Sequence, residues 1–331
     1  MLTFHRLPLD QVDWDLLDSY DDRVLMQRKG WLEFVQEITG GEIVIAQIEQ
    51  DGQTAGFYSG IKFRRCGVPI LGSPFRGWTS AYMGFNLHPD ISRLEAVKAL
   101  GPFAFRQMGC LHYEVIDRYL SMDLGADIGI SYRNIRNYQT DLTQTEDEMF
   151  ADMSSACRRA IRKSEKSGIT IEHAEPEGFA QEFHTHLTDV FAKQGMTPTF
   201  GVERVEKLIR HVYPSGDLLL ARVRDPDGLS IASGVFPGYK GFGLFWGNGS
   251  LRPHQIHRPN EALHWYAMRN FKEQGIPLYD WGGRATYKAK YGVSTFSVIA
   301  FRKSRIGASQ YARDLAEKIY YYPRHVRRAR Y

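Results

Sequence analysis

Two lysines separated by one residue, Lys288 and Lys290, alternate with tyrosines in the stretch YDWGGRATYKAKYG, residues 279–292. The stretch opens as an apolar strand and then becomes polar and cationic. Such a strand could deliver a lysine into a site that handles negative charge, because a fixed ammonium group stabilises a nearby anion. Residues two apart on a strand share one face. We therefore predict Lys288 as a catalytic cation, and the alternative is a pair of surface lysines.

Asp280 closes the strand that precedes this loop. Catalytic groups of α/β proteins gather at strand ends, and a carboxylate there can accept a proton or orient a lysine. The same side chain also suits a structural role, in which it caps the loop by accepting hydrogen bonds from the amides of Gly282 and Gly283. Both interpretations of Asp280 stay open at this point.

Five basic residues crowd the segment EDEMFADMSSACRRAIRKSEKSG, residues 146–168, whose apolar spacing predicts one amphipathic helix ending at Gly168. Arg158 and Arg162 lie one helical turn apart. Guanidinium groups bind phosphate through two parallel hydrogen bonds. We predict that Arg158 and Arg162 contact a phosphate-bearing substrate, and a solvated helix face is the alternative.

A second candidate anion site lies at the start of the helix predicted over residues 259–275. Arg258 precedes Pro259 there, and a helix N-terminus favours negative charge. The nearby histidines have no carboxylate or cysteine at ligand spacing, so we predict no metal site. His264 is a candidate general base, although a histidine that lines a core or cleft is more common.

Aromatic side chains beside these segments could wall a cleft for a sugar or a peptide, although such residues more often belong to the core. Trp246 lies in a predicted meander and Tyr291 flanks the two lysines. Arg76 lies in the aromatic stretch GSPFRGWTSAYMGF of the first half. We predict these three residues as further substrate-binding positions.

A mixed α/β scaffold must position these side chains. The first half contains a helix and then two β-rich runs around Asp51-Gly52, a strong hairpin signal. The second half repeats the order of helix, antiparallel strands, helix and strand. We predict two similar α/β units with mainly antiparallel sheets flanked by helices, one over residues 1–145 and the other over residues 146–331.

Composition excludes several classes of protein. The 331 residues carry 42 Lys and Arg against 38 Asp and Glu, and this mild net charge of +4 does not imply a dedicated nucleic-acid-binding protein, so we expect no DNA partner. The three cysteines show no metal-ligand spacing, which fits a reducing compartment. No apolar run is long enough to span a bilayer and no signal peptide is recognisable, so we expect a cytoplasmic protein.

The C-terminal stretch YYYPRHVRRARY is basic and aromatic. It follows a helix that we predict to start near Ser309. Such a tail could contact an anionic membrane surface or RNA, and a solvated charged helix is the alternative.

Three segments resemble the Fem-type aminoacyl transferases and related CelD-like acetyltransferases of the GNAT superfamily. They are ACRRAIRKSEKSGI, RPNEALHWYAMRNFKEQGIPLYDWGG and YKAKYG. The first is similar to the arginine-rich helix that opens the second unit of those proteins. The second is similar to a helix and strand that they share, and the third to their aromatic-Lys-x-x-aromatic-Gly element. The resemblance implies two tandem GNAT-like domains and places Lys288 at the site of acyl transfer.

The resemblance also implies the reaction class. An aminoacyl or acyl group would pass from aminoacyl-tRNA or acyl-CoA, used as a co-substrate without a tightly bound cofactor, to an amine of a peptidoglycan precursor or a small molecule. Two departures bear on the donor. The chain has no helical-hairpin insertion of the kind that Fem-type enzymes often carry, and the stretch RPHQIHRPNEA has none of the glycines with which GNAT enzymes hold the CoA pyrophosphate. The alternative is a GNAT-like protein that binds a nucleotide- or lipid-linked glycan without catalysis.

Overall fold

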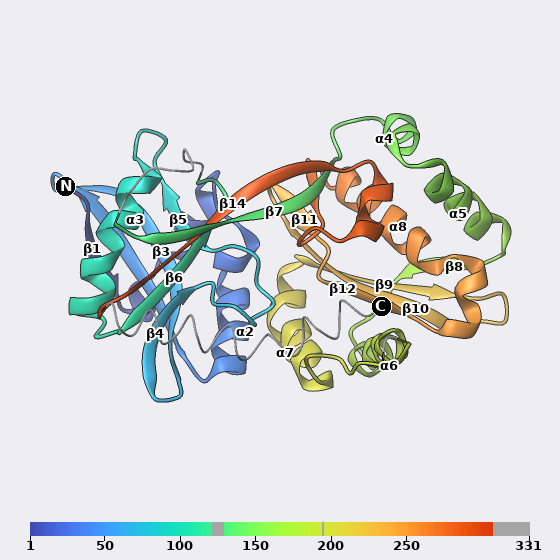
Figure 1. Ribbon diagram of the computed structural model, residues 1–331, viewed down its shortest axis with the longest axis horizontal. Coiled ribbons are helices and arrows are strands. Elements are labelled where there is room, and N and C mark those ends of the chain that lie inside the picture. Colours follow the sequence, from blue (N-terminus) through green and yellow to red (C-terminus); the bar gives the residue numbers. More distant parts are fainter. Residues whose placement is uncertain (121–128, 194, 307–331) are drawn as a thin grey trace. The chain divides into compact units, whose positions relative to one another are not determined.

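The computed structural model describes residues 1–120, 129–193 and 195–306, which form two compact units (Figure 1). Of the described residues, the first unit contains 1–20, 39–120, 129–134 and 298–306, and the second contains 21–38, 135–193 and 195–297. A short early segment therefore packs with the second unit. The predicted domain boundary at residues 145 and 146 stays a prediction. The helix expected from Ser309 and the basic tail lie outside the described residues.

The first unit contains an antiparallel meander that ends in a parallel pair. Its strands follow the order β1-β2-β3-β4-β6-β14, with β5 paired to β3. Only β4 and β6 run parallel among these pairs. The elements that lie wholly in this unit are β1 (Thr3–Leu7), α1 (Trp14–Ser19), β2 (Glu42–Gln50), β3 (Gln53–Arg65), β4 (Val68–Ser73), β5 (Gly84–Leu87), α3 (Arg93–Pro102), a π-helical turn (Phe103–Gln107) and β6 (His112–Asp117).

The predicted hairpin at Asp51-Gly52 is confirmed. Gln50 pairs with Gln53, so the loop between β2 and β3 has two residues. Both have positive φ, 53° for Asp51 and 81° for Gly52. This combination matches the twist of the flanking strands, which is why Asp-Gly is favoured at such turns.

The second unit repeats the pattern, with strand order β7-β13-β11-β10-β9-β8 and β12 paired to β10. Here β11 and β13 form the parallel pair. The elements are α2 (Lys29–Thr39), β7 (Ser131–Asp141), α4 (Glu146–Asp152), α5 (Ser155–Lys166), β8 (Thr170–His173), α6 (Phe179–Ala192), α7 (Val202–Val212), β9 (Leu218–Arg224), β10 (Ser230–Tyr239), β11 (Phe242–Leu244), β12 (Gly247–Ser250), α8 (Pro259–Glu273), β13 (Leu278–Asp280), the 3-10 helix η6 (Thr286–Tyr291) and β14 (Ser294–Ser304). Thr39 of α2, residues 131–134 of β7 and residues 298–304 of β14 belong to the first unit.

Helices cover both faces of the second sheet, with α8 on one face and α6 on the other (Figure 1). The ring of Phe271 from α8 lies over Gly238 and Gly243, which pair across β10 and β11. A Cβ atom at Gly243 would lie 2.3 Å from that ring. On the opposite face, a Cβ atom at Gly249 would lie 2.5 Å from the backbone of α6. Glycines therefore set how closely both helices approach the strands.

The single helix predicted over residues 146–168 is wrong, because the segment forms two helices. Met153 adopts an extended conformation with ψ of 150° and ends α4. The Ser154 hydroxyl then accepts a hydrogen bond from the Cys157 amide and starts α5. A serine in this position competes with helix continuation by capping a new one. The apolar stripe survives the break, since Met149, Met153, Cys157 and Ile161 join one buried cluster.

The predicted fold class is confirmed: the structure is mixed α/β, with mainly antiparallel strands and flanking helices. The three-strand meander predicted in the second half forms β9, β10 and a third run that is divided into β11 and β12, both paired with β10. Within the described ranges, no helix combines the length and the apolar character needed to cross a bilayer.

Candidate active site

A local irregularity in the second sheet creates the candidate site. Gly238 of β10 pairs with Gly243, and Val235 of β10 pairs with Gly247. The two pairs are three residues apart along β10 but four residues apart along the facing chain. This extra residue is a β-bulge at Phe245 and Trp246. Bulges re-aim side chains next to active sites.

The same irregularity separates β11 from its parallel neighbour β13. Gly243 pairs with Tyr279 and Leu244 with Asp280, and the Phe245 amide donates a final hydrogen bond of 2.8 Å to the Asp280 carbonyl. After Leu244 the chain no longer pairs with β13 as a strand, and it continues as β12, which pairs with β10 alone. The point outside the carboxyl ends of diverging parallel strands is where α/β folds bind ligands.

Asp280 is fully buried, and its Oδ1 accepts a hydrogen bond of 2.8 Å from the Gly282 amide. Gly282 has φ of 62°, and a Cβ atom there would lie 3.2 Å from the Phe245 carbonyl oxygen. Glycine fits this left-handed turn without steric cost. The contact with Gly282 agrees with the capping interpretation of Asp280, and its catalytic role stays a prediction.

Lys288 is buried with 7% of its surface exposed, and its ammonium donates a hydrogen bond to the Trp281 carbonyl oxygen. The Nζ atom lies 4.9 Å from the ring centroid of Phe245, a cation–π distance. Burial lowers the pKa of Lys288 to about 8, against the opposing effect of the Asp280 carboxylate. The alternative of a surface lysine is therefore wrong for Lys288.

Lys290 does not share the environment of Lys288. The two residues lie on η6 rather than on a strand. The Lys290 ammonium binds Oε1 of Glu261 at 2.6 Å, in the first turn of α8. The expectation of one shared strand face was wrong because the loop after Gly283 tightens into a 3-10 helix, in which neighbours two apart point in different directions.

His264 lies in the aromatic core behind the lysine. Its Nδ1 is 2.9 Å from the Tyr279 hydroxyl, and its ring centroid is 4.7 Å from Phe245 and 4.6 Å from Trp281. Burial, followed by Lys288 and Lys290, holds the pKa of His264 well below its usual value, so the ring stays neutral. Such burial is the common role for a histidine on a helix, and within the described ranges no group of three or more possible ligands could hold a metal.

The predicted arginines of α5 have different contacts. Arg158 donates through Nη1 to the carbonyl oxygens of Ala151 and Met153 at 2.6 and 2.8 Å, and so caps the C-terminus of α4. The Arg162 guanidinium lies 5.2 Å from the Phe150 ring centroid and is exposed. Their predicted roles in substrate binding remain predictions, and Nη1 of Arg158 already has two carbonyl partners.

The other predicted positions are dispersed. Tyr291 is enclosed, with 1% exposure and its ring stacked 4.5 Å from that of Trp281. Trp246 packs against Phe200 at 5.2 Å. Its indole nitrogen is buried without a hydrogen-bond partner among the described residues. Arg258 is exposed, with φ of 58°, immediately before α8. Arg76 is exposed and belongs to the first unit.

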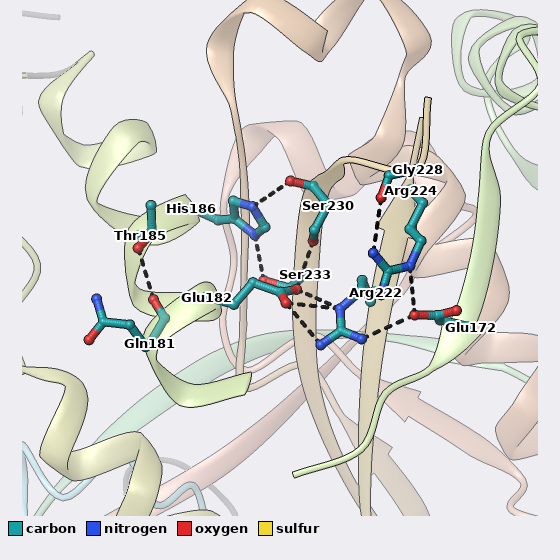
Figure 2. Close-up of polar contacts among 10 residues, drawn as sticks. All are labelled: Glu172, Gln181, Glu182, Thr185, His186, Arg222, Arg224, Gly228, Ser230 and Ser233. Carbon is teal, nitrogen blue, oxygen red and sulfur yellow. Dashed lines mark hydrogen bonds and ion pairs between the residues drawn. The ribbon is translucent and has the colours of Figure 1, made fainter. Parts of the chain in front are cut away.

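A polar network that sequence reasoning missed ties α6 to β8, β9 and β10 (Figure 2). Arg222 contacts Glu182 at 2.8 Å and Glu172 at 3.1 Å, and Arg224 contacts Glu172 at 3.0 Å. The alternation Arg-Val-Arg on β9, which places both arginines on one face, was the available signal. The two arginines are neutralised by the two glutamates, so the network holds the helix and strands together and offers no unpaired charge to a ligand.

Comparisons with known proteins bear on the family and the fold. Residues 151–291 match the family model described as an acetyltransferase (GNAT) domain. The crystal structure of FemX superposes with a TM-score of 0.75 at 14% identity, covering 93% of this chain and 99% of that chain. No curated protein matches in sequence.

Two further structures share the fold. A tandem GNAT protein from the clavulanic acid biosynthesis pathway gives a TM-score of 0.54 at 11% identity, covering 92% of this chain and 98% of that one. The C-terminal domain of a putative lysylphosphatidylglycerol synthetase from Agrobacterium fabrum gives 0.52 at 13%, covering 83% and 87%. Residues 151–291 thus match a GNAT acetyltransferase domain, and the chain shares the duplicated GNAT fold of FemX and of the tandem GNAT protein.

Proposed function

We propose that the protein transfers an acyl group from an activated ester or thioester to an amine, at the point where β11 and β13 diverge. One observation carries this proposal: the buried Lys288 ammonium is held beside that divergence by the Trp281 carbonyl. Among buried aromatic side chains, a fixed cation stabilises a developing oxyanion more strongly than it would in water.

The reaction needs no covalent enzyme intermediate. The amine nitrogen attacks the carbonyl carbon, a C–N bond forms, and the C–O or C–S bond of the donor breaks. The leaving alcohol or thiol takes up the proton that the amine loses. Lys288 stabilises the oxyanion between these steps, and Asp280, whose Oδ1 is fixed by the Gly282 amide, is the nearby carboxylate that can relay the proton.

The start of α8 supports an aminoacyl ester of RNA as the donor rather than acyl-CoA. Pro259, the first residue of α8, has no amide hydrogen, and the 3-10 helix Arg252–His257 that precedes it contains no glycine. A pyrophosphate needs free amides at a helix N-terminus. Acyl-CoA is the second candidate, favoured by the acetyltransferase family model. The acceptor class is an amine of a peptidoglycan precursor or small molecule.

A donor panel tests this function. Wild-type protein is incubated with radiolabelled aminoacyl-tRNA or acetyl-CoA and an amine acceptor such as a lysine-containing muropeptide precursor. Lys288→Met keeps the side-chain volume and removes the charge, so we expect it to fold and to lose roughly 10²- to 10³-fold in kcat. The control is Lys290→Met combined with Glu261→Gln, which removes the neighbouring ion pair and should keep kcat.

Two results would contradict the proposal. Transfer by Lys288→Met at the wild-type rate would remove the lysine from the chemistry. Binding of donors without transfer under any condition would favour the non-catalytic alternative.

A further inference from the structure

The outward face of α5 carries a continuous stripe of cations. Arg159, Arg162, Lys163 and Lys166 recur at intervals of three and four residues, so they lie on one side of the helix. All four are exposed. The opposite side is the buried stripe of Cys157, Ala160, Ile161 and Ser164.

This stripe has no neutralising partners among the described residues. Glu165, the one carboxylate on α5, lies on the flank of the helix, and no ion pair joins it to the four cations in the described ranges. The basic residues of α7 differ, because Lys207 and Arg210 pair with Glu37 of α2 at 3.6 and 3.2 Å. The cations of α5 therefore keep their charge available for an external anion.

The N-terminal end of α5, rather than the stripe itself, is hydrogen-bonded to the candidate active site. The amide of Ser154, the N-cap of α5, donates a hydrogen bond of 2.9 Å to the carbonyl oxygen of Lys290 on η6. Because η6 also carries Lys288, a long polyanion on α5 can present its acylated end to the site. The four cations span about 10 Å along the helix axis at 1.5 Å per residue, enough for successive phosphates of one strand.

We propose that the outward face of α5 is the docking surface for the phosphate backbone of the RNA portion of the acyl donor, a proposal that rests on the proposed function. Two arginines supply bidentate contacts to phosphate oxygens, and two lysines supply point charges. RNA fits better than a lipid surface, because the apolar side of α5 is buried in the core and none of its exposed residues is a large hydrophobic that could enter a membrane.

The test measures binding of deacylated total transfer RNA over a series of salt concentrations. Lys163→Gln with Lys166→Gln removes two unpaired cations. The matched control, Lys207→Gln with Arg210→Gln, removes the same charge from α7. We expect the α5 variant to bind RNA more weakly and to lower the salt slope by roughly 1.4 to 1.8, since each phosphate contact contributes about 0.7 to 0.9. The control should keep the wild-type slope.

Kinetics separates this inference from the proposed function. The α5 variant should raise KM for aminoacyl-tRNA and leave kcat unchanged, whereas Lys288→Met should bind RNA as the wild type does and lose kcat. If no donor supports transfer, RNA binding and its dependence on α5 remain measurable.

Equal RNA binding by the α5 variant and the wild type would overturn the proposal. So would α5-dependent binding to phosphatidylglycerol vesicles without binding to RNA, because that result would assign the surface to a membrane.

Discussion

At the scale of single residues, the proposed function depends on the environment of Lys288. A lysine ammonium in water carries a high pKa and a mobile hydration shell. Here burial brings the pKa to about 8, and the Trp281 carbonyl and the Phe245 ring fix the direction of the charge. The lysine is therefore a cation at neutral pH that loses its proton under mildly alkaline conditions.

The pH dependence of kcat follows from that shift. Below about pH 8 Lys288 is protonated and stabilises the oxyanion, and above it the charge is lost. We expect the wild-type kcat, measured from pH 6 to 10 at saturating substrates, to fall above pH 8. Lys288→Arg keeps its charge throughout this range, so the ratio of wild-type to variant kcat should decline there. A ratio that rises through pH 8 would instead make Lys288 a base.

At the scale of elements, the packing of α8 on β10 and β11 sets the position of the site. The helix can approach only because Gly238 and Gly243 leave room for the ring of Phe271. The same helix presents His264 to the aromatic core and Glu261 to Lys290. Any displacement of α8 therefore moves groups that surround Lys288.

Gly243→Ala tests this packing. Its Cβ atom would lie 2.3 Å from the Phe271 ring, so we expect a loss of about 1 to 3 kcal/mol in the free energy of unfolding, measured by urea denaturation. Phe271→Leu in the same chain should recover part of that loss, which a double-mutant cycle quantifies. Additive effects of the two substitutions would refute the steric explanation.

At the scale of the whole molecule, two buried histidines couple folding to pH. Burial lowers the pKa of both His186 and His264 below the value of 6.5 that applies to the unfolded chain. As pH falls through 6.5, the two histidines bind protons in the unfolded state, whereas in the folded state they stay neutral. Stability is therefore fully present above that pH and is lost below it.

Acid should consequently destabilise the protein steeply. We expect Tm to drop between pH 7.5 and pH 5, with a contribution from each histidine of up to about 1.4 kcal/mol per pH unit. His186→Gln, which removes one of the two groups, should reduce the slope relative to wild type. An unchanged slope in this variant would show that His186 is not responsible.

The sequence by itself determined the local features. Binary patterns and turn residues are short-range properties, so the Asp51-Gly52 hairpin, the meander and α8 were predictable, as was the duplicated α/β architecture. The motif around Lys288 drew attention to a lysine that the structure buries, and its catalytic role stays a prediction. The break between α4 and α5 was missed, because the apolar stripe continues across it and hides the cap at Ser154.

Only the tertiary structure decided which of the candidate groups share an environment. Lys288 and Lys290 are two residues apart, yet one is buried beside Trp281 and the other is paired with Glu261. Arg158 and Arg162 look equivalent in sequence, but one contacts carbonyl oxygens of the chain itself. The physical reason is that burial and charge pairing depend on contacts between distant segments, which spacing along the chain does not encode.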